Sequence, residues 1–399
     1  MHCDPRFARV REVFERQFAD GEELGAGFAV HLDGELVVDL WDGLADRRTG
    51  RAWERDTPAF AYSCTKAITA AVLLRLAEQG LVDVSAPVAD VWPEFAAGGK
   101  RSVTVAHLLS HQAGLPAIDD RVPVEEFEDH PAIAARLARQ EPVWEPGTAH
   151  GYHALTYGFL IGEVVRRVSG KSVGDLVAAE IAGPLHLDLW VGAPDDVVAR
   201  AARLKAADRP APGTRPATPA APAGRTPAAA GEGVPDLMAE MARAALDPGS
   251  LMNRALGNPG MHLLEGGANN PVILRAGWPA AGVVTTARGL AGFYRALIAG
   301  EILRPETLRD ATRRRVDGPD RVLFVQSSFG LGFMRPSMMF PMPSATAFGH
   351  SGMGGSLGMG DPEHGLGIGY IMNRMSNTAT GGLRALNLVQ AVYDSLKSL

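Results

Sequence analysis

A serine and a lysine three positions apart, Ser63 and Lys66, are the side chains in this sequence best suited to chemistry. Residues with this spacing share one face of a helix and lie within reach of each other. A lysine amine buried among apolar neighbours has a lowered pKa, so its free base can accept the serine proton. The amide of Ser63, at a helix N-terminus, points the right way to stabilise an oxyanion. The pair therefore predicts a serine nucleophile with a lysine base.

The alternative for this pair is a serine that caps a helix, with the lysine on the solvated helix surface one turn later. The following segment does not favour it, because apolar residues lie almost all round the predicted helix, which ends at Gly80. The chain has only five lysines, so a chance Ser-x-x-Lys is uncommon. Cys64 lies between the two residues, but nothing marks it as a nucleophile more strongly than Ser63. We therefore expect a buried central helix that opens at Ser63.

Four other patterns that could carry chemistry are incomplete. Residues 170–172 (Gly-Lys-Ser) lack the glycine that a phosphate-binding loop needs five residues earlier, and the C-terminal glycines form no Gly-x-Gly-x-x-Gly. His107 and His111 are four residues apart, but no glutamate follows His107, so we expect them to brace a loop instead of binding a metal. Residues 349–353 approach the Gly-x-Ser-x-Gly nucleophile elbow but end in methionine. We expect neither a metal nor a cofactor.

Composition and charge exclude several classes of protein. Lys+Arg total 39 against 45 Asp+Glu, a net charge of −6 without a basic block, so we do not expect nucleic-acid binding. No apolar run reaches the about 18 residues of a membrane span, and no secretory leader is expected at the N-terminus. The two cysteines, Cys3 and Cys64, predict reduced thiols and a cytoplasmic protein.

The predicted elements change character along the chain. Strands at 27–32 and 35–41 flank Asp33-Gly34, a two-residue connection typical of a hairpin. Further strands are predicted at 329–333, 347–350 and 366–372, the last two joined through a turn at 361–365. Helices are predicted at about 5–20, 105–110, 131–139, 155–168, 173–181, 287–298 and 382–396. The two ends of the chain thus mix strands and helices, whereas the middle is helical.

This order of elements predicts an α+β fold, with an antiparallel sheet flanked by helices and a helical domain inserted between the two ends of the chain. Residues 1–82 and 279–399 would form the discontinuous α/β sheet domain, and residues 83–278 the helical domain. Residues 206–233, dominated by Ala and Pro, predict an extended surface excursion, with a lid over the site as the alternative.

Four stretches, in the right order, resemble the class C β-lactamase and penicillin-binding-protein superfamily, particularly its family VIII carboxylesterases. Residues 62–66 (Tyr-Ser-Cys-Thr-Lys) resemble its Ser-x-x-Lys box, and residues 105–115 are similar to its Leu-Leu-x-His-x-Ser-Gly-Leu segment. Residues 145–154 resemble the Pro-Gly…Tyr-x-Asn region, and residues 348–355 resemble the Lys-Thr-Gly strand. The resemblance extends from about residue 27 to the C-terminal helix, apart from the Ala/Pro-rich excursion.

The resemblance implies a β-lactamase/transpeptidase-like fold and an acyl-enzyme mechanism. Ser63 would attack a carbonyl carbon, with Lys66 and Tyr152 sharing the proton, the tyrosine as an anionic or hydrogen-bonded relay. The amides of Ser63 and Met353 would form the oxyanion hole. The residues implied in substrate binding are His153, His350, Ser351 and Gly352.

Two residues depart from the pattern of the penicillin-recognising members. Ala154 stands where they have Asn, and His350, whose charge would vary near neutral pH, stands where they have Lys. Losing an amide donor and a permanent cation favours neutral esters over peptides or antibiotics.

We therefore expect a serine esterase that acts on small or medium acyl esters as its small-molecule partners. The alternatives are a β-lactam or amide hydrolase or acyltransferase with the same nucleophile, and a catalytically silent binding homologue. Candidates for the pocket lining are Trp190, Trp278, Phe127 and residues 338–340.

Overall fold

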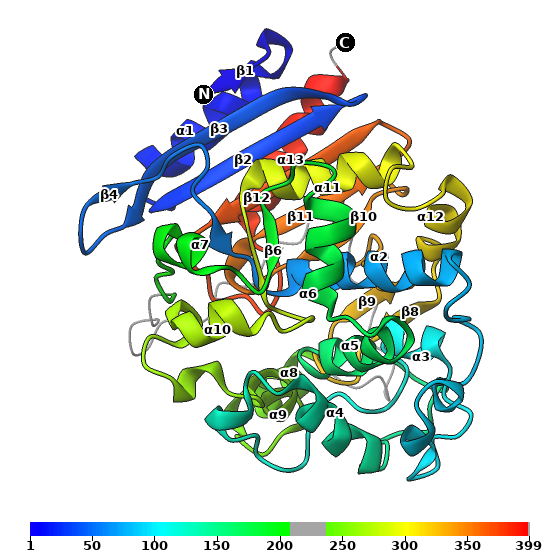
Figure 1. The fold of residues 1–399 in the computed structure, drawn as a ribbon. Coiled ribbons are helices and arrows are strands. Elements are labelled where there is room, and N and C mark those ends of the chain that lie inside the picture. Colours follow the sequence, from blue (N-terminus) through cyan, green and yellow to red (C-terminus); the bar gives the residue numbers. More distant parts are fainter. Residues whose placement is uncertain (208–236, 398–399) are drawn as a thin grey trace, which may run out of the picture.

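The computed structural model describes residues 1–207 and 237–397. Its largest sheet joins strands from both ends of the chain, in the order β1-β3-β2-β12-β11-β10, with β4 beside β3 (Figure 1). These strands are β1 (His2–Cys3), β2 (Gly25–Leu32), β3 (Glu35–Asp46), β4 (Arg51–Ala52), β10 (Phe348–Ser351), β11 (Leu357–Asp361) and β12 (Leu366–Met372). All neighbouring pairs in it are antiparallel, so the predicted α+β fold with an antiparallel sheet is confirmed.

The first hairpin follows directly from its two turn residues. Asp33 and Gly34 both have positive φ, 48° and 89°, as the tight turns that match the twist of paired strands require. Beside this hairpin β12 pairs with β2, with Ile368 opposite Val30. The C-terminal part of the chain is thereby joined to the N-terminal part in one sheet.

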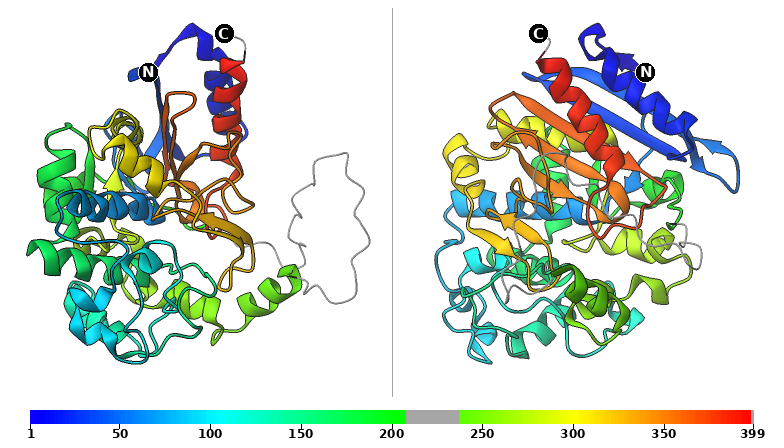
Figure 2. Two further views of the ribbon diagram at one scale, coloured as in Figure 1. Left: turned by 90° about the vertical axis from the view of Figure 1, so that its right-hand side faces the viewer. Right: turned by 180° about the vertical axis from the view of Figure 1, so that it is seen from behind.

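Helices cover both faces of this sheet. The helices α1 (Ala8–Ala19) and α13 (Leu383–Leu396) lie side by side on one face, and α11 (Ala287–Ile298) lies on the other (Figure 2). Successive side chains of a strand point to opposite faces, so the core is divided into two clusters. Val30 packs into the cluster that includes α1 and α13, and its neighbour Ala29 packs into the cluster that includes α11. A Cβ on Gly369 of β12 would lie 2.3 Å from the carbonyl oxygen of Ala287, so glycine permits the close approach of α11.

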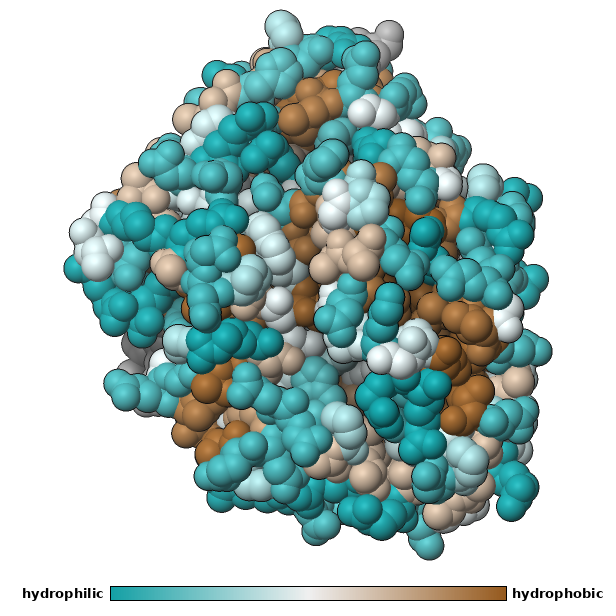
Figure 3. All heavy atoms as spheres, viewed as in Figure 1, coloured by the Kyte–Doolittle hydropathy of each residue, from teal (hydrophilic) through white to brown (hydrophobic). Residues whose placement is uncertain are grey.

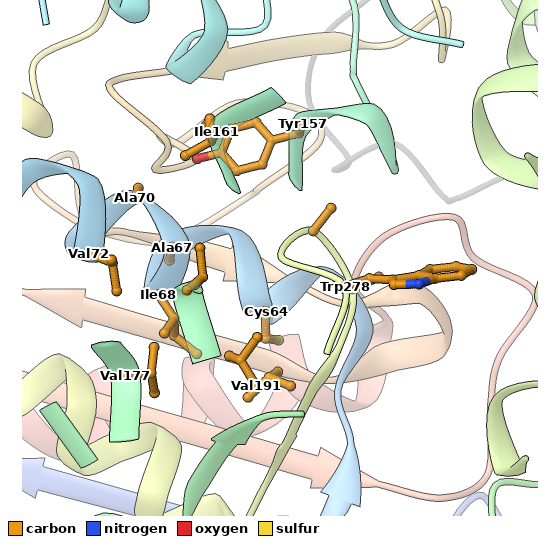
Figure 4. Packing of buried hydrophobic residues seen from close by; sticks show 14 of the residues in the cluster. Cys64, Ala67, Ile68, Ala70, Val72, Tyr157, Ile161, Val177, Val191 and Trp278 are labelled. Carbon is orange, nitrogen blue, oxygen red and sulfur yellow. The ribbon is translucent and has the colours of Figure 1, made fainter. Parts of the chain in front are cut away.

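The helix that carries Lys66 is the buried centre of the molecule, as the sequence predicts. Helix α2 (Thr65–Glu78) has eleven buried residues and follows a single 3₁₀ turn at Tyr62–Cys64. Figure 4 shows part of its surroundings: Ala67, Ile68, Ala70 and Val72 of α2, with Tyr157 and Ile161 on one side and Val177 and Val191 on the other. Since apolar side chains meet it from several directions, a lysine near its start cannot reach solvent through the helix surface.

The rest of the described chain contains further helices and two small sheets. The further helices are α3 (Val105–Leu109), α4 (His130–Arg139), α5 (Thr156–Ser169), α6 (Val173–Leu176), α7 (Asp195–Arg200), α8 (Leu237–Leu246), α9 (Leu251–Gly257), α10 (Pro271–Ala276) and α12 (Pro305–Ala311). One small sheet contains β5 (Ala59–Phe60), β7 (Val283–Thr285) and β6 (Leu189–Val191), and the other contains β8 (Val316–Pro319) and β9 (Gln326–Phe329). The predicted helix at 173–181 is α6 continued by a π-helical turn, Val177–Ala182.

Two strand predictions were wrong. The strand predicted at 329–333 ends at Phe329, because the chain bends at residues 330–332, where a Cβ on Gly330 would lie 2.1 Å from the carbonyl oxygen of Ala311. The turn at 361–365 joins β12 to β11, a strand that the sequence analysis missed, and not directly to the strand at 347–350. Strand β11 contains glycine at 358 and 360 and has weak intrinsic strand propensity; burial and pairing on both sides hold it in the sheet.

Residues 83–278, predicted as a helical insert, also supply β6, which pairs with β7 of the C-terminal part of the chain. The predicted excursion at 206–233 lies outside the described residues apart from its first two. The face in Figure 3 is mostly hydrophilic, with apolar side chains in separate small areas. Among the described residues, no helix has the length and apolar character needed to span a membrane.

Candidate active site

Ser63 and Lys66 are brought together by the tight start of α2. Tyr62, directly before the serine, has a φ of 47°, a left-handed conformation that costs a bulky residue free energy. The turn is fixed by the Thr65 hydroxyl, which donates to the carbonyl oxygen of Tyr62 at 2.6 Å and accepts from the Val283 amide at 2.9 Å. With this geometry the Lys66 Nζ lies 3.1 Å from the Ser63 Oγ, as the three-residue spacing predicts.

The surroundings of Lys66 favour a neutral amine. The side chain is fully buried, and burial lowers the pKa of Lys66 well below that of an ordinary lysine. Its Nζ donates to the carbonyl oxygens of Ala154 at 2.7 Å and Ala280 at 3.0 Å. A neutral amine has two N–H groups and one lone pair, so these carbonyls use both protons and the lone pair is left for the Ser63 hydroxyl. The amine is thus arranged to accept a proton from Ser63.

Tyr152 reaches the pair from an irregular segment that precedes α5. Its ring is buried, and the Lys66 Nζ lies 4.8 Å from the ring centroid. Burial raises the pKa of the Tyr152 hydroxyl, and the Ser63 hydroxyl beside it opposes that rise only in part. The phenol is therefore neutral in the resting protein, which does not favour the anionic relay.

His153 lies next to Tyr152 but points away from the cavity. Its Nε2 accepts from the Leu115 amide at 3.0 Å, and its Nδ1 donates to the Gly151 carbonyl oxygen at 2.7 Å. Burial lowers the pKa of His153 to about 4, so the ring is neutral and both nitrogens are already used. The predicted contact with substrate does not fit this geometry, since the side chain braces the backbone instead.

The two histidines of the preceding loop have the bracing positions that the sequence predicts. His107 accepts from the amide of Thr104 at 3.3 Å in a capping box at the start of α3. His111, buried and with a φ of 62°, accepts from the His153 amide at 3.1 Å. The described residues contain no group of three or more His, Cys, Asp or Glu that could hold a metal ion.

The end of β10 forms another wall of the site, with a different role for each residue. His350 donates from Nδ1 to the Ser351 carbonyl oxygen at 2.8 Å, and burial lowers the pKa of His350 to about 3. The expectation that its charge varies near neutral pH was therefore wrong, because a fully buried imidazole stays neutral there. The Ser351 hydroxyl contacts the sulfur of Met334 at 3.7 Å, so neither side chain presents a charge to a ligand.

Gly352 and Met353 bring the backbone of this wall next to Ser63. A Cβ on Gly352 would lie 2.4 Å from the carbonyl oxygen of Ala61, so only glycine permits this contact. Met353 begins one 3₁₀ turn, and Ser63 is the second residue of another. Amides at these positions have no acceptor within their own turn. Both residues line the same cavity; that their amides donate to an oxyanion stays a prediction.

A cavity of about 270 Å³ opens beside Ser63 and is largely apolar. It is lined by Tyr62, Ser63, Tyr152, Ala154, Leu155, Leu256, Pro259, Met261, His262, Gly267, Ala268, Ala281, Met353 and Ala379. The residues at 256–268 and Ala379 were not predicted, because nothing in their types marks them as a pocket wall. The candidates predicted for the lining lie elsewhere: Trp278 is buried and donates to the Phe127 carbonyl oxygen at 2.7 Å, Trp190 lines another cavity, and Met338 is exposed.

Comparison with known proteins places this fold and site in a defined class. Residues 10–393 match the sequence model of the Beta-lactamase family. A relative named Esterase/beta-lactamase LipL, from Mycobacterium tuberculosis, is 37% identical over 94% of this chain and 82% of its own length. A crystal structure of a family VIII carboxylesterase superposes with a TM-score of 0.84 at 36% identity, covering 99% of both chains. A penicillin-binding protein homologue from Caulobacter crescentus superposes with a TM-score of 0.82 at 38% identity, again covering 99% of both chains.

The fold and the site define a β-lactamase-like serine hydrolase. The chain belongs to the beta-lactamase family, and the resemblance to that superfamily seen in the sequence is confirmed.

Proposed function

We propose that this protein is a serine esterase that hydrolyses small or medium acyl esters through an acyl-enzyme on Ser63. The observation that carries the proposal is the neutral, buried amine of Lys66, 3.1 Å from the Ser63 hydroxyl and beside an apolar cavity. A hydroxyl is a weak nucleophile unless a base takes its proton, and this amine is placed to do so.

In the acylation half-reaction, Lys66 takes the Ser63 proton while the Oγ attacks the ester carbonyl carbon. The amides of Ser63 and Met353 donate to the oxyanion that forms. When this intermediate collapses, the bond from carbon to the alcohol oxygen breaks. The proton passes from Lys66 through the Tyr152 hydroxyl to the leaving oxygen, so the alcohol departs neutral and the amine returns to its free base.

Deacylation runs through the same groups with water as the nucleophile. Tyr152 and Lys66 take one proton from the water as its oxygen attacks the acyl carbon. The bond from that carbon to the Ser63 Oγ then breaks, and the Oγ recovers the proton from Lys66. The carboxylic acid is released, and the enzyme is ready for another turnover.

The charge of the site favours esters over β-lactams. His350, where penicillin-recognising relatives have a lysine, is buried and neutral, and Ala154 supplies no amide donor. A carboxylate on the ligand would therefore find no cation at position 350 and no amide donor at position 154. The cavity walls are mostly apolar, which suits an uncharged acyl chain. Relatives named as esterases support ester hydrolysis, although LipL is also named a β-lactamase.

We further infer that the protein works in the cytoplasm on a small-molecule ester. Both cysteines are free thiols, with Cys64 buried and Cys3 part-buried, which suits a reducing compartment.

The test compares hydrolysis of p-nitrophenyl butyrate by the wild type and by Ser63→Ala. The variant should lose turnover, whereas Ser395→Ala, which removes a buried hydroxyl on α13, should keep it. A p-nitrophenyl phosphonate should leave one adduct on Ser63, located by mass spectrometry. Equal hydrolysis by Ser63→Ala would end the proposal. Faster turnover of a cephalosporin, or faster acyl transfer to an added alcohol, would replace ester hydrolysis with one of the alternatives.

A further inference from the structure

The hydroxyl of Tyr152 is placed by a segment without regular secondary structure. Residues 150–153 precede α5, and none of them belongs to a helix or strand. Such a segment has no hydrogen-bond ladder of its own, so its backbone groups must find partners elsewhere. Gly151 donates to the His111 carbonyl oxygen at 3.1 Å, and His153 donates to the His111 ring. The partner of the Tyr152 amide itself lies in a distant part of the chain.

That partner is the carboxylate of Asp320, at the tip of the β8–β9 hairpin. One oxygen, Oδ1, accepts from the Tyr152 amide at 3.1 Å and from the Val322 and Leu323 amides at 2.9 Å each. The side chain is 1% exposed, so it is isolated from water, and these amides donate the hydrogen bonds that water would otherwise supply. A buried carboxylate that accepts several charge-assisted hydrogen bonds holds its partners firmly.

The second oxygen extends the contact to the other end of the same segment. Oδ2 accepts from the Ser327 hydroxyl at 3.1 Å, and the Ser327 Oγ lies 2.9 Å from the Nε2 of His150. The Arg321 amide also donates to the His150 carbonyl oxygen at 3.1 Å. The hairpin tip thus holds the segment at residue 150 through one set of contacts and at Tyr152 through another.

Close packing between these two contacts leaves the segment little freedom. A Cβ on Gly151 would lie 2.9 Å from Val322 and 2.8 Å from Trp144. With both ends hydrogen-bonded and the middle packed, the position of the Tyr152 backbone depends on the hairpin tip.

We infer that Asp320 is a positioning residue for catalysis, which fixes the Tyr152 hydroxyl beside Ser63 by holding the Tyr152 amide. The inference rests on the proposed role of Tyr152 and adds a residue 168 positions away in sequence. The competing explanation is that Asp320 only caps its own hairpin, since two of its three amide partners are Val322 and Leu323.

The experiment measures kcat and KM for p-nitrophenyl butyrate in full-length Asp320→Ala and Asp320→Asn. A misplaced proton relay should cost on the order of 10²-fold in kcat in Asp320→Ala with KM little changed. Asp320→Asn keeps an acceptor oxygen and should recover most of that loss. The matched control is Asp361→Asn, which alters another buried carboxylate that is hydrogen-bonded to the hydroxyls of Thr346 and Tyr393. It should keep the wild-type kcat per folded molecule.

A double-mutant cycle separates positioning from hairpin capping. If Asp320 acts through the phenol, Asp320→Ala combined with Tyr152→Phe should be no slower than Tyr152→Phe alone. Additive losses, or a fall in thermal stability with unchanged kcat, would overturn the inference. If Tyr152→Phe itself keeps full kcat, the role of Tyr152 and this inference both fail, whereas a phosphonate adduct on Ser63 would still support the nucleophile.

Ser327→Ala provides a milder test if Asp320→Ala does not fold. It removes the contact between Oδ2 and the Ser327 hydroxyl but leaves the Oδ1 contact with the Tyr152 amide. We expect Ser327→Ala to lose part of the wild-type kcat, and we expect no such loss when Ser327→Ala is added to Tyr152→Phe. A loss of equal size in both backgrounds would contradict the inference.

Discussion

The two halves of the site are built in different ways. Ser63 and Lys66 lie on one turn at the start of α2, and their contact follows from a spacing of three residues. The opposite half comes from the irregular segment that carries Tyr152 and from the 3₁₀ turn after β10 that begins at Met353, far apart in sequence. The first half depends on local geometry, whereas the second depends on contacts made by distant parts of the chain.

The helical half supplies the nucleophile and the base, and the loop half positions the proposed relay and oxyanion donors around them. Burial at the start of α2 lowers the pKa of Lys66 and so prepares the base. The relay and the oxyanion donors require that backbone from three regions meet within hydrogen-bond distance. Substitutions in the helical half should therefore remove the reaction, and those in the loop half should degrade it.

The largest effect is expected from Lys66→Met, which keeps the shape of the side chain but removes the base. We expect kcat for p-nitrophenyl butyrate to fall on the order of 10³-fold. Lys100→Met is the matched control, because Lys100 is also fully buried and also donates to two backbone carbonyls, those of Ala97 and Gln140. It should cost stability without abolishing turnover. Equal losses of kcat in both variants would show that turnover falls when any buried lysine is removed, and that the position of Lys66 beside Ser63 is not the cause.

In the loop half Gly352→Ala should have an effect as large as that of Asp320→Ala. The added Cβ would lie 2.4 Å from the carbonyl oxygen of Ala61, so the end of β10 must move away from Ser63 and take the Met353 amide with it. A displacement of this size should lower kcat on the order of 10²-fold. Gly249→Ala, where the nearest atom would lie 3.4 Å away, should be silent. Wild-type kcat in a folded Gly352→Ala would show that the Met353 amide is not needed.

The fold was largely predictable because its signals are local. The Asp33-Gly34 turn indicates the first hairpin, and apolar residues around the helix after Lys66 indicate its central position. Strand β11 was missed because glycines at 358 and 360 favour no strand; pairing on both sides supplies what propensity does not. The division into a sheet domain and a helical domain stays a prediction.

The site was predictable only where one helical turn or the resemblance to known proteins places it. The carbonyl oxygens of Ala154 and Ala280, which accept from Lys66, are backbone atoms that no residue type reveals. His153 was expected to face substrate because it lies next to Tyr152. Its direction is set by the amide of Leu115, a contact 38 residues away that periodicity cannot show. The roles of Tyr152 and Met353 stay predictions, for which the experiments above provide tests.

Buried histidines should make the loop half sensitive to acid. Burial lowers the pKa of His153 to about 4 and that of His350 to about 3, against about 6.5 in an unfolded chain. The unfolded state therefore binds more protons below pH 6.5, and stability is lost as the pH falls from there toward 4. Each histidine contributes at most about 1.4 kcal/mol per pH unit and about half of that at pH 6.5 itself, so the pair should cost roughly 3 kcal/mol between pH 6.5 and 5.

Urea unfolding at pH 7 and pH 5 checks this expectation. The double variant His153→Gln and His350→Asn keeps hydrogen-bonding groups but cannot titrate, so it should lose the share of the pH dependence that these two histidines contribute, while the buried His111 keeps its own share. His262→Gln, at an exposed position in the cavity wall, should keep it. An unchanged pH dependence in the double variant would mean that other buried groups cause the acid sensitivity.

The smallest effect is expected from Cys64→Ala, at the contact between the two halves. The thiol is fully buried, its Sγ lies 3.5 Å from the His350 carbonyl oxygen, and burial raises the pKa of Cys64 to about 12. A thiol with so raised a pKa is not a nucleophile at neutral pH, so kcat should stay within about twofold of the wild type. Stability should fall by about 1 kcal/mol because a small cavity remains between α2 and β10. A loss of kcat comparable with that of Ser63→Ala would reverse the assignment and make the thiol, not the neighbouring hydroxyl, the reactive group.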